Sequence, residues 1–151
     1  SICEELLQRG CNPNTLAENG NAPLADAAFY RNAPFMRLLM AAGALVDNRN
    51  KDGGTALHIS CVVMSVECVS DLCKAGADKS QICQYEGKSQ TAVQITEGKL
   101  AAATAQGNYD EQARNYEILV IFRDCNTSPI ESPMLSDPDY IHLQSATSAK
   151  T

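Results

Sequence analysis

The chain has 151 residues, enough for about one domain, and carries a formal net charge of −6 with a pI of about 4.8. This acidic balance, with Lys and Arg scattered singly, argues against nucleic acid as a partner, because binding to phosphates needs a basic face. No run of about 18 apolar residues occurs, which excludes membrane insertion, and no secretory signal is visible at the first residues.

The apolar content consists mainly of small side chains. Hydrophobic residues make up 44% of the chain, and 20 Ala and 7 Cys account for much of that share. Leu, Ile, Val and Phe together reach only about a fifth, near the border of disordered compositions. We therefore expect a thin core with closely spaced layers.

The cysteine pattern favours reduced thiols. Seven Cys is an odd number, and no C-x-x-C pair occurs. An even disulfide framework is thus excluded, and a cytoplasmic or nuclear location fits better. Neither zinc-ligand spacing nor paired His is present, so we expect no metal and no cofactor.

Three segments end in the same way at a fixed interval. Gly10, Gly43 and Gly76 lie 33 residues apart, and each follows a helix-like apolar pattern. The motif Thr55-Ala56-Leu57-His58 repeats the positions of Ala22-Pro23-Leu24-Ala25, again 33 residues earlier. The period predicts a partial unit over 1–16 and full units over 17–49 and 50–82.

Each unit is predicted to be a short helix, a tight turn, a second helix and a glycine stop. Thr55 is predicted to be the N-cap of a first helix, and Gly76 suits the left-handed position that ends a second helix. Pro23 and Pro34 fall in the first turns of two helices, where a missing N–H is tolerated.

The pattern resembles the ankyrin repeat, with its T-P-L-H motif, its V-x-x-L-L second helix and its closing G-A-D. The best match runs from Asp52 to Cys61 and ends at Gly76-Ala77-Asp78. The resemblance covers about three and a half repeats over residues 1–125. It implies an all-α solenoid of stacked antiparallel helix pairs with hairpin loops. It also implies a concave face that binds proteins.

Two features depart from the ankyrin pattern. Arg31 and Met64 occupy the glycine position between the paired helices, where a positive φ is costly, so we expect this turn to be reshaped. The fourth unit, residues 83–125, carries insertions and is predicted to be an irregular capping repeat, with 100–105 extending its first helix.

Residues 126–151 form a C-terminal tail with three Pro and five Ser and no sustained periodicity. The tail is predicted to be either a solvated linker or a segment that docks on its own repeats. In the second case it is a candidate autoinhibitor of the binding groove.

No catalytic constellation is found, and we expect a protein that is not an enzyme. Cys61, Cys68 and Cys73 fall on core-facing positions, whereas Cys83 is expected to be an exposed loop thiol. Gly87-Lys88-Ser89 lacks the upstream glycine of a phosphate-binding loop, so a hairpin turn is the better interpretation.

A binding surface is the remaining candidate site. By resemblance, partners meet the hairpin tips and two exposed positions late in each first helix. The predicted partner-binding residues are Glu18, Asn19, Asn21, Phe29, Tyr30, Lys51, Asp52, Val62 and Val63, together with Gly54. Phe29 and Tyr30 are the proposed anchors, because aromatic residues are favoured at interfaces. The alternative is that some of the late-helix side chains turn into the core.

The predicted function is therefore non-catalytic recognition of a protein or peptide whose identity the sequence does not give. The alternative is a regulatory or targeting segment of a larger enzyme or channel whose catalytic part lies outside this chain.

Overall fold

The computed structural model describes residues 2–125, with side chains from Glu4 onward. The paired helices are α1 (Ile2–Gln8), α2 (Pro23–Phe29), α3 (Ala33–Ala41), α4 (Ala56–Val62), α5 (Val66–Lys74), α6 (Ala92–Gln106) and α7 (Tyr109–Asp124). Two strands, β1 (Ile82–Tyr85) and β2 (Lys88–Thr91), form an antiparallel hairpin before α6. The 126–151 segment, and with it the expected tail docking, lies outside the described residues.

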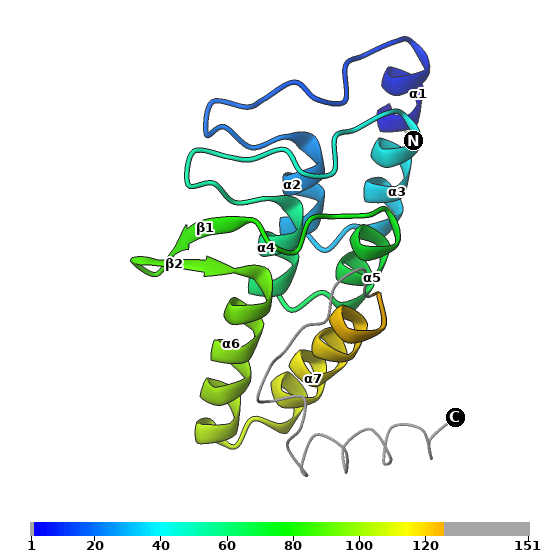
Figure 1. Ribbon diagram of the computed structural model, residues 1–151. Helices are drawn as coiled ribbons and strands as arrows, with labels where there is room; N and C mark the ends of the chain where they lie inside the picture. The colour runs from blue at the N-terminus through cyan, green and yellow to red at the C-terminus, as the bar shows by residue number, and fades with distance from the viewer. Residues whose placement is uncertain (1, 126–151) are drawn as a thin grey trace, which may run out of the picture.

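The helices form two layers (Figure 1). The first helices of the repeats, α2, α4 and α6, stack on one another, and the second helices, α3, α5 and α7, stack beside them. The loops that precede α2 and α4, and the β1–β2 hairpin that precedes α6, project on the same side of the stack. The predicted solenoid of antiparallel helix pairs is confirmed.

Small side chains allow the layers to approach closely. Ala28 and Cys61 are fully buried at the same position of neighbouring inner helices, and Cys68 is fully buried in α5. Larger apolar residues such as Leu24 and Met36 fill the space between the two layers. The thin core expected from the composition is thus built from Ala and Cys at repeated positions.

The glycine stops behave as predicted. Gly10, Gly43 and Gly76 have φ values of +86°, +93° and +85°. The residue after each glycine donates its N–H to the carbonyl five residues earlier, at distances of 2.9 to 3.1 Å. The positive φ and this hydrogen bond together form the Schellman ending, which gives hydrogen-bond partners to carbonyl groups that have none within the helix.

The turn between paired helices is not reshaped, contrary to expectation. Arg31 and Met64 adopt φ values of +56° and +54°, the left-handed conformation that glycine would take. Asn32 donates its N–H to the Ala27 oxygen at 2.8 Å, and Ser65 does so to the Ser60 oxygen at 2.9 Å. These bonds complete the same Schellman ending, so the hydrogen-bonded turn prevails over the steric preference of the residue.

The fourth unit contains the one departure from an all-helical fold among residues 2–125. Its extended hairpin pairs as β1 and β2, with Tyr85 opposite Lys88 across the two-residue turn Glu86-Gly87. Both turn residues have positive φ, +50° and +75°, as the favoured hairpin turn requires. The predicted hairpin turn in this segment is confirmed, but Cys83 is buried in β1 and is not an exposed thiol.

The last helix pair is longer than the others. α6 and α7 have 15 and 16 residues, and α6 includes the alanine-rich 100–105 segment as predicted. The C-terminal end of α7 is held by Lys79, whose Nζ donates to the Cys125 oxygen at 2.9 Å. A lysine here satisfies a free carbonyl and complements the helix dipole.

Arg31→Gly tests the strain at the inter-helix turn. Glycine removes a left-handed penalty of about 1 to 2 kcal/mol and adds an unfolded-state entropy cost of about 0.5 to 1 kcal/mol. We expect the free energy of unfolding in urea to rise by about 0.5 to 1 kcal/mol. The matched control is Ala42→Gly, at a residue with φ of −83°, which should lower it. A loss of stability in Arg31→Gly would show that the turn is unstrained.

Candidate protein-binding face

The hairpin loops are tied to one another by side chains. Asn50 Nδ2 donates to Asn21 Oδ1 of the preceding loop at 3.1 Å, and Asn21 Nδ2 donates to Asp26 Oδ1 at 3.1 Å. Asn50 Oδ1 also accepts the N–H of Gly54 at 2.8 Å within its own loop. One asparagine therefore fixes both the shape of its loop and the distance to its neighbour.

Cations complete these ties. Lys51 Nζ donates to the Glu18 carbonyl oxygen at 2.8 Å, and Arg49 Nη2 donates to the Ile82 carbonyl oxygen at 2.7 Å. Both links span 33 residues, the repeat length. The three loops thus form a connected row, and ordering this surface on binding costs little additional entropy.

The motif Thr55-His58 links the start of α4 to the end of the segment that leads into β1. The Thr55 N–H donates to His58 Nδ1 at 3.1 Å, so Nδ1 is unprotonated. His58 Nε2 therefore carries the hydrogen and donates to the Gln81 carbonyl oxygen at 2.9 Å. Burial lowers the pKa of His58 below its ordinary value, and nearby Arg49 adds to this effect against the opposing Gln81 bond. The neutral imidazole is the form that the fold requires.

The late positions of α2 present two aromatic rings to solvent. Phe29 and Tyr30 are 58% and 77% exposed, and their ring centroids lie 5.3 Å apart in an edge-to-face arrangement. Such geometry is the favoured one for an aromatic pair. The predicted exposure of both anchors is confirmed.

The equivalent residues of α4 are less exposed than expected. Val62 and Val63 are both half-buried, and Val62 packs against the hydrophobic core. Valine is shorter than phenylalanine. At the same helix position its methyl groups therefore stay within the layer of inner helices, whereas the rings of Phe29 and Tyr30 extend beyond that layer. The two valines therefore form the floor of the face next to the aromatic pair.

The predicted loop residues divide into two groups, apart from Gly54, which is buried. Asn19 Oδ1 accepts the Asn21 N–H at 2.9 Å, and Asn21 and Lys51 hold neighbouring loops together, so these three shape the scaffold. Glu18 and Asp52 are exposed at the loop tips and remain candidates for direct contact.

Two further residues of the same face were not predicted from the sequence. Gly98 and Lys99 lie seven and eight residues after the N-cap Thr91 of α6, as Val62 and Val63 lie after Thr55. Thr91 and Gln94 form a capping box like that of Thr55 and His58. The 36-residue interval between the two threonines was the signal that could have located them.

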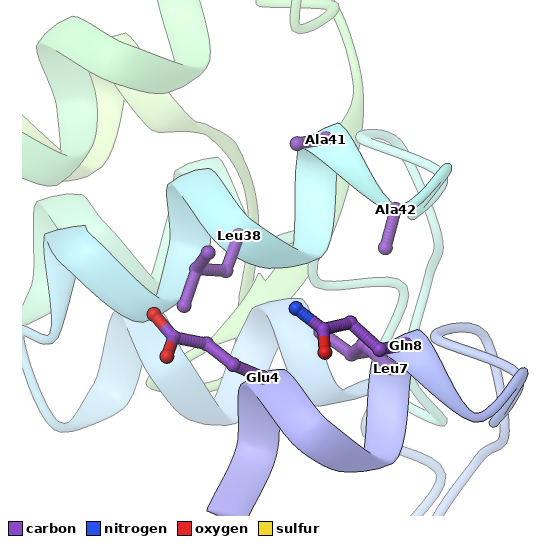
Figure 2. Close-up of a pocket in the computed structure, with 6 residues that line it drawn as sticks. All are labelled: Glu4, Leu7, Gln8, Leu38, Ala41 and Ala42. Atoms are coloured by element: carbon purple, nitrogen blue, oxygen red, sulfur yellow. The ribbon is translucent and has the colours of Figure 1, made fainter. Parts of the chain in front are cut away.

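A second concave feature lies on the outer helices. Leu7 and Gln8 of α1 face Leu38 and Ala41 of α3 across an open groove of about 470 Å³, with Glu4 at its edge (Figure 2). Between α3 and α5 the corresponding space is crossed by Arg37, whose Nε donates to Asp71 Oδ2 at 2.8 Å. This groove belongs to the layer that carries none of the predicted binding residues.

The described residues offer little reactive chemistry. Burial raises the pKa of the Cys61 and Cys73 thiols to about 12, so neither forms a thiolate nucleophile at neutral pH. No cluster of three or more His, Cys, Asp or Glu suited to a metal ion occurs among residues 2–125. None of the helices in that range is long and apolar enough to span a bilayer.

Repeat length, loop row, capping motifs and glycine stops all match one class of protein. A family model for ankyrin repeats (3 copies) matches residues 1–83, more than half of the chain. The chain belongs to the ankyrin-repeat family.

Individual relatives agree with this assignment. The chain is 26% identical over 122 residues to the nuclear factor NF-kappa-B p105 subunit of Gallus gallus, covering 77% of this chain and 12% of that protein. It is 30% identical over 110 residues to an ankyrin repeat-containing protein of Schizosaccharomyces pombe, covering 72% of this chain and 46% of that protein. The chain thus spans less than half the length of these relatives.

A solved structure shares the arrangement of the helices. It is the ankyrin repeat domain of Bcl-3, described as a unique member of the IkappaB protein family. The TM-score is 0.56 at 26% sequence identity, over 61% of this chain and 40% of that one.

The state of His58 predicts a pH dependence of stability. Because the folded-state pKa is lowered, the unfolded chain binds more protons near pH 6, so stability is present above the unfolded pKa of about 6.5 and falls as pH decreases through it. The midpoint of urea unfolding should therefore drop between pH 7.5 and 5.5. His58→Gln, which copies the Gln94 capping box, should flatten this drop. Parallel curves for both proteins would contradict the assignment.

Proposed function

We propose that this chain is a non-catalytic protein–protein interaction module that binds a protein or peptide through the ends of its inner helices and the adjacent loop tips. The observation that carries the proposal is the exposed Phe29–Tyr30 pair on a rigid helix end. Adjacent large apolar side chains on an exposed surface are typical of a protein interaction site.

The energetics favour these rings as the centre of an interface. Each aromatic side chain can bury about 150 to 250 Å², and truncating an interface anchor typically costs about 2 kcal/mol or more. Tyr30 also offers a hydroxyl that can form a hydrogen bond with a partner. A pair held edge to face loses little side-chain freedom on binding.

The loop tips support the same role. Glu18 and Asp52 are exposed on neighbouring loops that Lys51 holds together. A polar rim beside an apolar centre is the common anatomy of a protein interface. The same face would also serve in a regulatory or targeting segment of a larger enzyme or channel, because recognition requires only these residues.

A double variant, Phe29→Ala/Tyr30→Ala, tests the face. Both side chains are more than half exposed, so the fold should be retained, while partner capture from cell lysate should fall at least about tenfold, the equivalent of about 1.4 kcal/mol. Quantitative mass spectrometry of bound proteins gives the readout.

Tyr109→Ala is the matched control, because Tyr109 is 79% exposed on α7. The control should retain every partner of the unmodified chain. Equal capture by the double variant and the control would reject the face.

A further inference from the structure

The three inner helices present the same two positions, which lie at the C-terminal ends of α2 and α4 and in the middle of α6. Counting from the N-caps Ala22, Thr55 and Thr91, the seventh and eighth residues align across the stack. We call this set the end row; its members are Phe29, Tyr30, Val62, Val63, Gly98 and Lys99. α4 packs against both α2 and α6, so the row follows the stack direction (Figure 1).

The end row descends in steps. The side chain at the seventh position becomes smaller along the row, from the ring of Phe29 through Val62 to Gly98, which has no side chain. A Cβ built on Gly98 meets no atom within 4 Å, so the space above it is open. Because packed helices lie about 8 to 10 Å apart, the row is about 20 Å long, with an aromatic wall at one end and an open step at the other.

Cations stand at both ends of the end row. Arg31 is exposed directly after Tyr30, and Lys99 is half-buried beside Gly98. Neither side chain has an ion-pair or hydrogen-bond partner among residues 2–125. Glu97 comes directly before Gly98, at the helix position that the buried residues Ala28 and Cys61 occupy in the other two units. Burial raises the pKa of the Glu97 carboxyl. Its side chain therefore belongs to the inward side of α6.

The loop tips have a different charge pattern. Each of the three carries an exposed carboxylate, from Glu18, Asp52 and Glu86, and the exposed Lys51 and Lys88 place cations beside the last two. The charges of the loop tips are therefore mixed, whereas Arg31 and Lys99 favour negative charge in a partner that lies over the end row. The apolar row and its terminal cations together select both the chemistry and the location of the partner.

We propose that the end row binds a short acidic amphipathic helix. A bulky apolar side chain of that helix fills the step above Gly98, other apolar residues cover Val62 and the aromatic pair, and carboxylates near its two ends meet Arg31 and Lys99. A helix of about 14 residues matches the length of the row. The proposal rests on the proposed function, since it specifies the partner of the same face.

Two labelled 15-residue peptides test the charge preference with the full 151-residue chain. They share the same Leu, Phe and Ala positions at helical spacing, and their polar positions are Glu in one and Lys in the other. Fluorescence anisotropy at about 50 mM salt should show at least tenfold tighter binding of the Glu peptide. Arg31→Glu/Lys99→Glu should remove that preference, with circular dichroism used to verify folding.

Gly98 variants test the step without weakening the fold. Leu and Ala are both better helix formers than glycine, so Gly98→Leu and Gly98→Ala should raise Tm. Gly98→Leu fills the step and should weaken binding of the Glu peptide at least tenfold. Gly98→Ala leaves most of the space open and should change it less than threefold.

Each outcome has a defined meaning. Equal binding of the two peptides, preference for the Lys peptide, binding of neither, or unchanged binding in Gly98→Leu would overturn the acidic-helix proposal. If the Phe29/Tyr30 double variant still loses its cellular partners in that case, the face stands and only the partner class is wrong. If the double variant loses no partner, the face itself is rejected.

Discussion

A pair of short helices buries too little apolar surface to be stable alone, so every unit of this chain depends on close contact with its neighbour. That contact requires small side chains where inner helices meet, and Ala28 and Cys61 meet the requirement. Once the helices are close, the loops at their N-terminal ends are close as well. Side chains such as Asn50 and Lys51 can then bridge one loop to the next. The binding face is therefore a product of the stacking distance.

Much of the architecture could be predicted from the sequence because it repeats. A glycine every 33 residues identifies a helix ending that few other residues adopt without strain, and Gly10, Gly43 and Gly76 all have it. The exposure of Phe29 and Tyr30 was also predictable, because the ankyrin pattern leaves these two late positions of the first helix exposed. Local rules sufficed in these places because no tertiary contact opposed them.

The remaining features depend on competition between local preference and context. Arg31 and Met64 keep a left-handed turn because the bonds around it are completed by the next helix. Val62 occupies the helix position of Phe29 with a shorter side chain, and this decides whether the side chain reaches beyond the layer. Cys83 is buried because the inserted residues pair as strands, which a count of added residues does not reveal. Each of these features depends on how the side chain or turn packs in the folded chain, which the repeat pattern of the sequence does not specify.

The use of cysteine as a packing residue links the integrity of the repeat stack to its redox surroundings. Conversion of the fully buried Cys61 to a sulfenic or sulfinic acid would place added polar oxygen where the layers have no space for it. The same burial raises the pKa of the Cys61 thiol to about 12, which leaves almost no thiolate to react with an oxidant. Oxidation of Cys61 would therefore disrupt the core strongly, and the same close packing makes that oxidation slow.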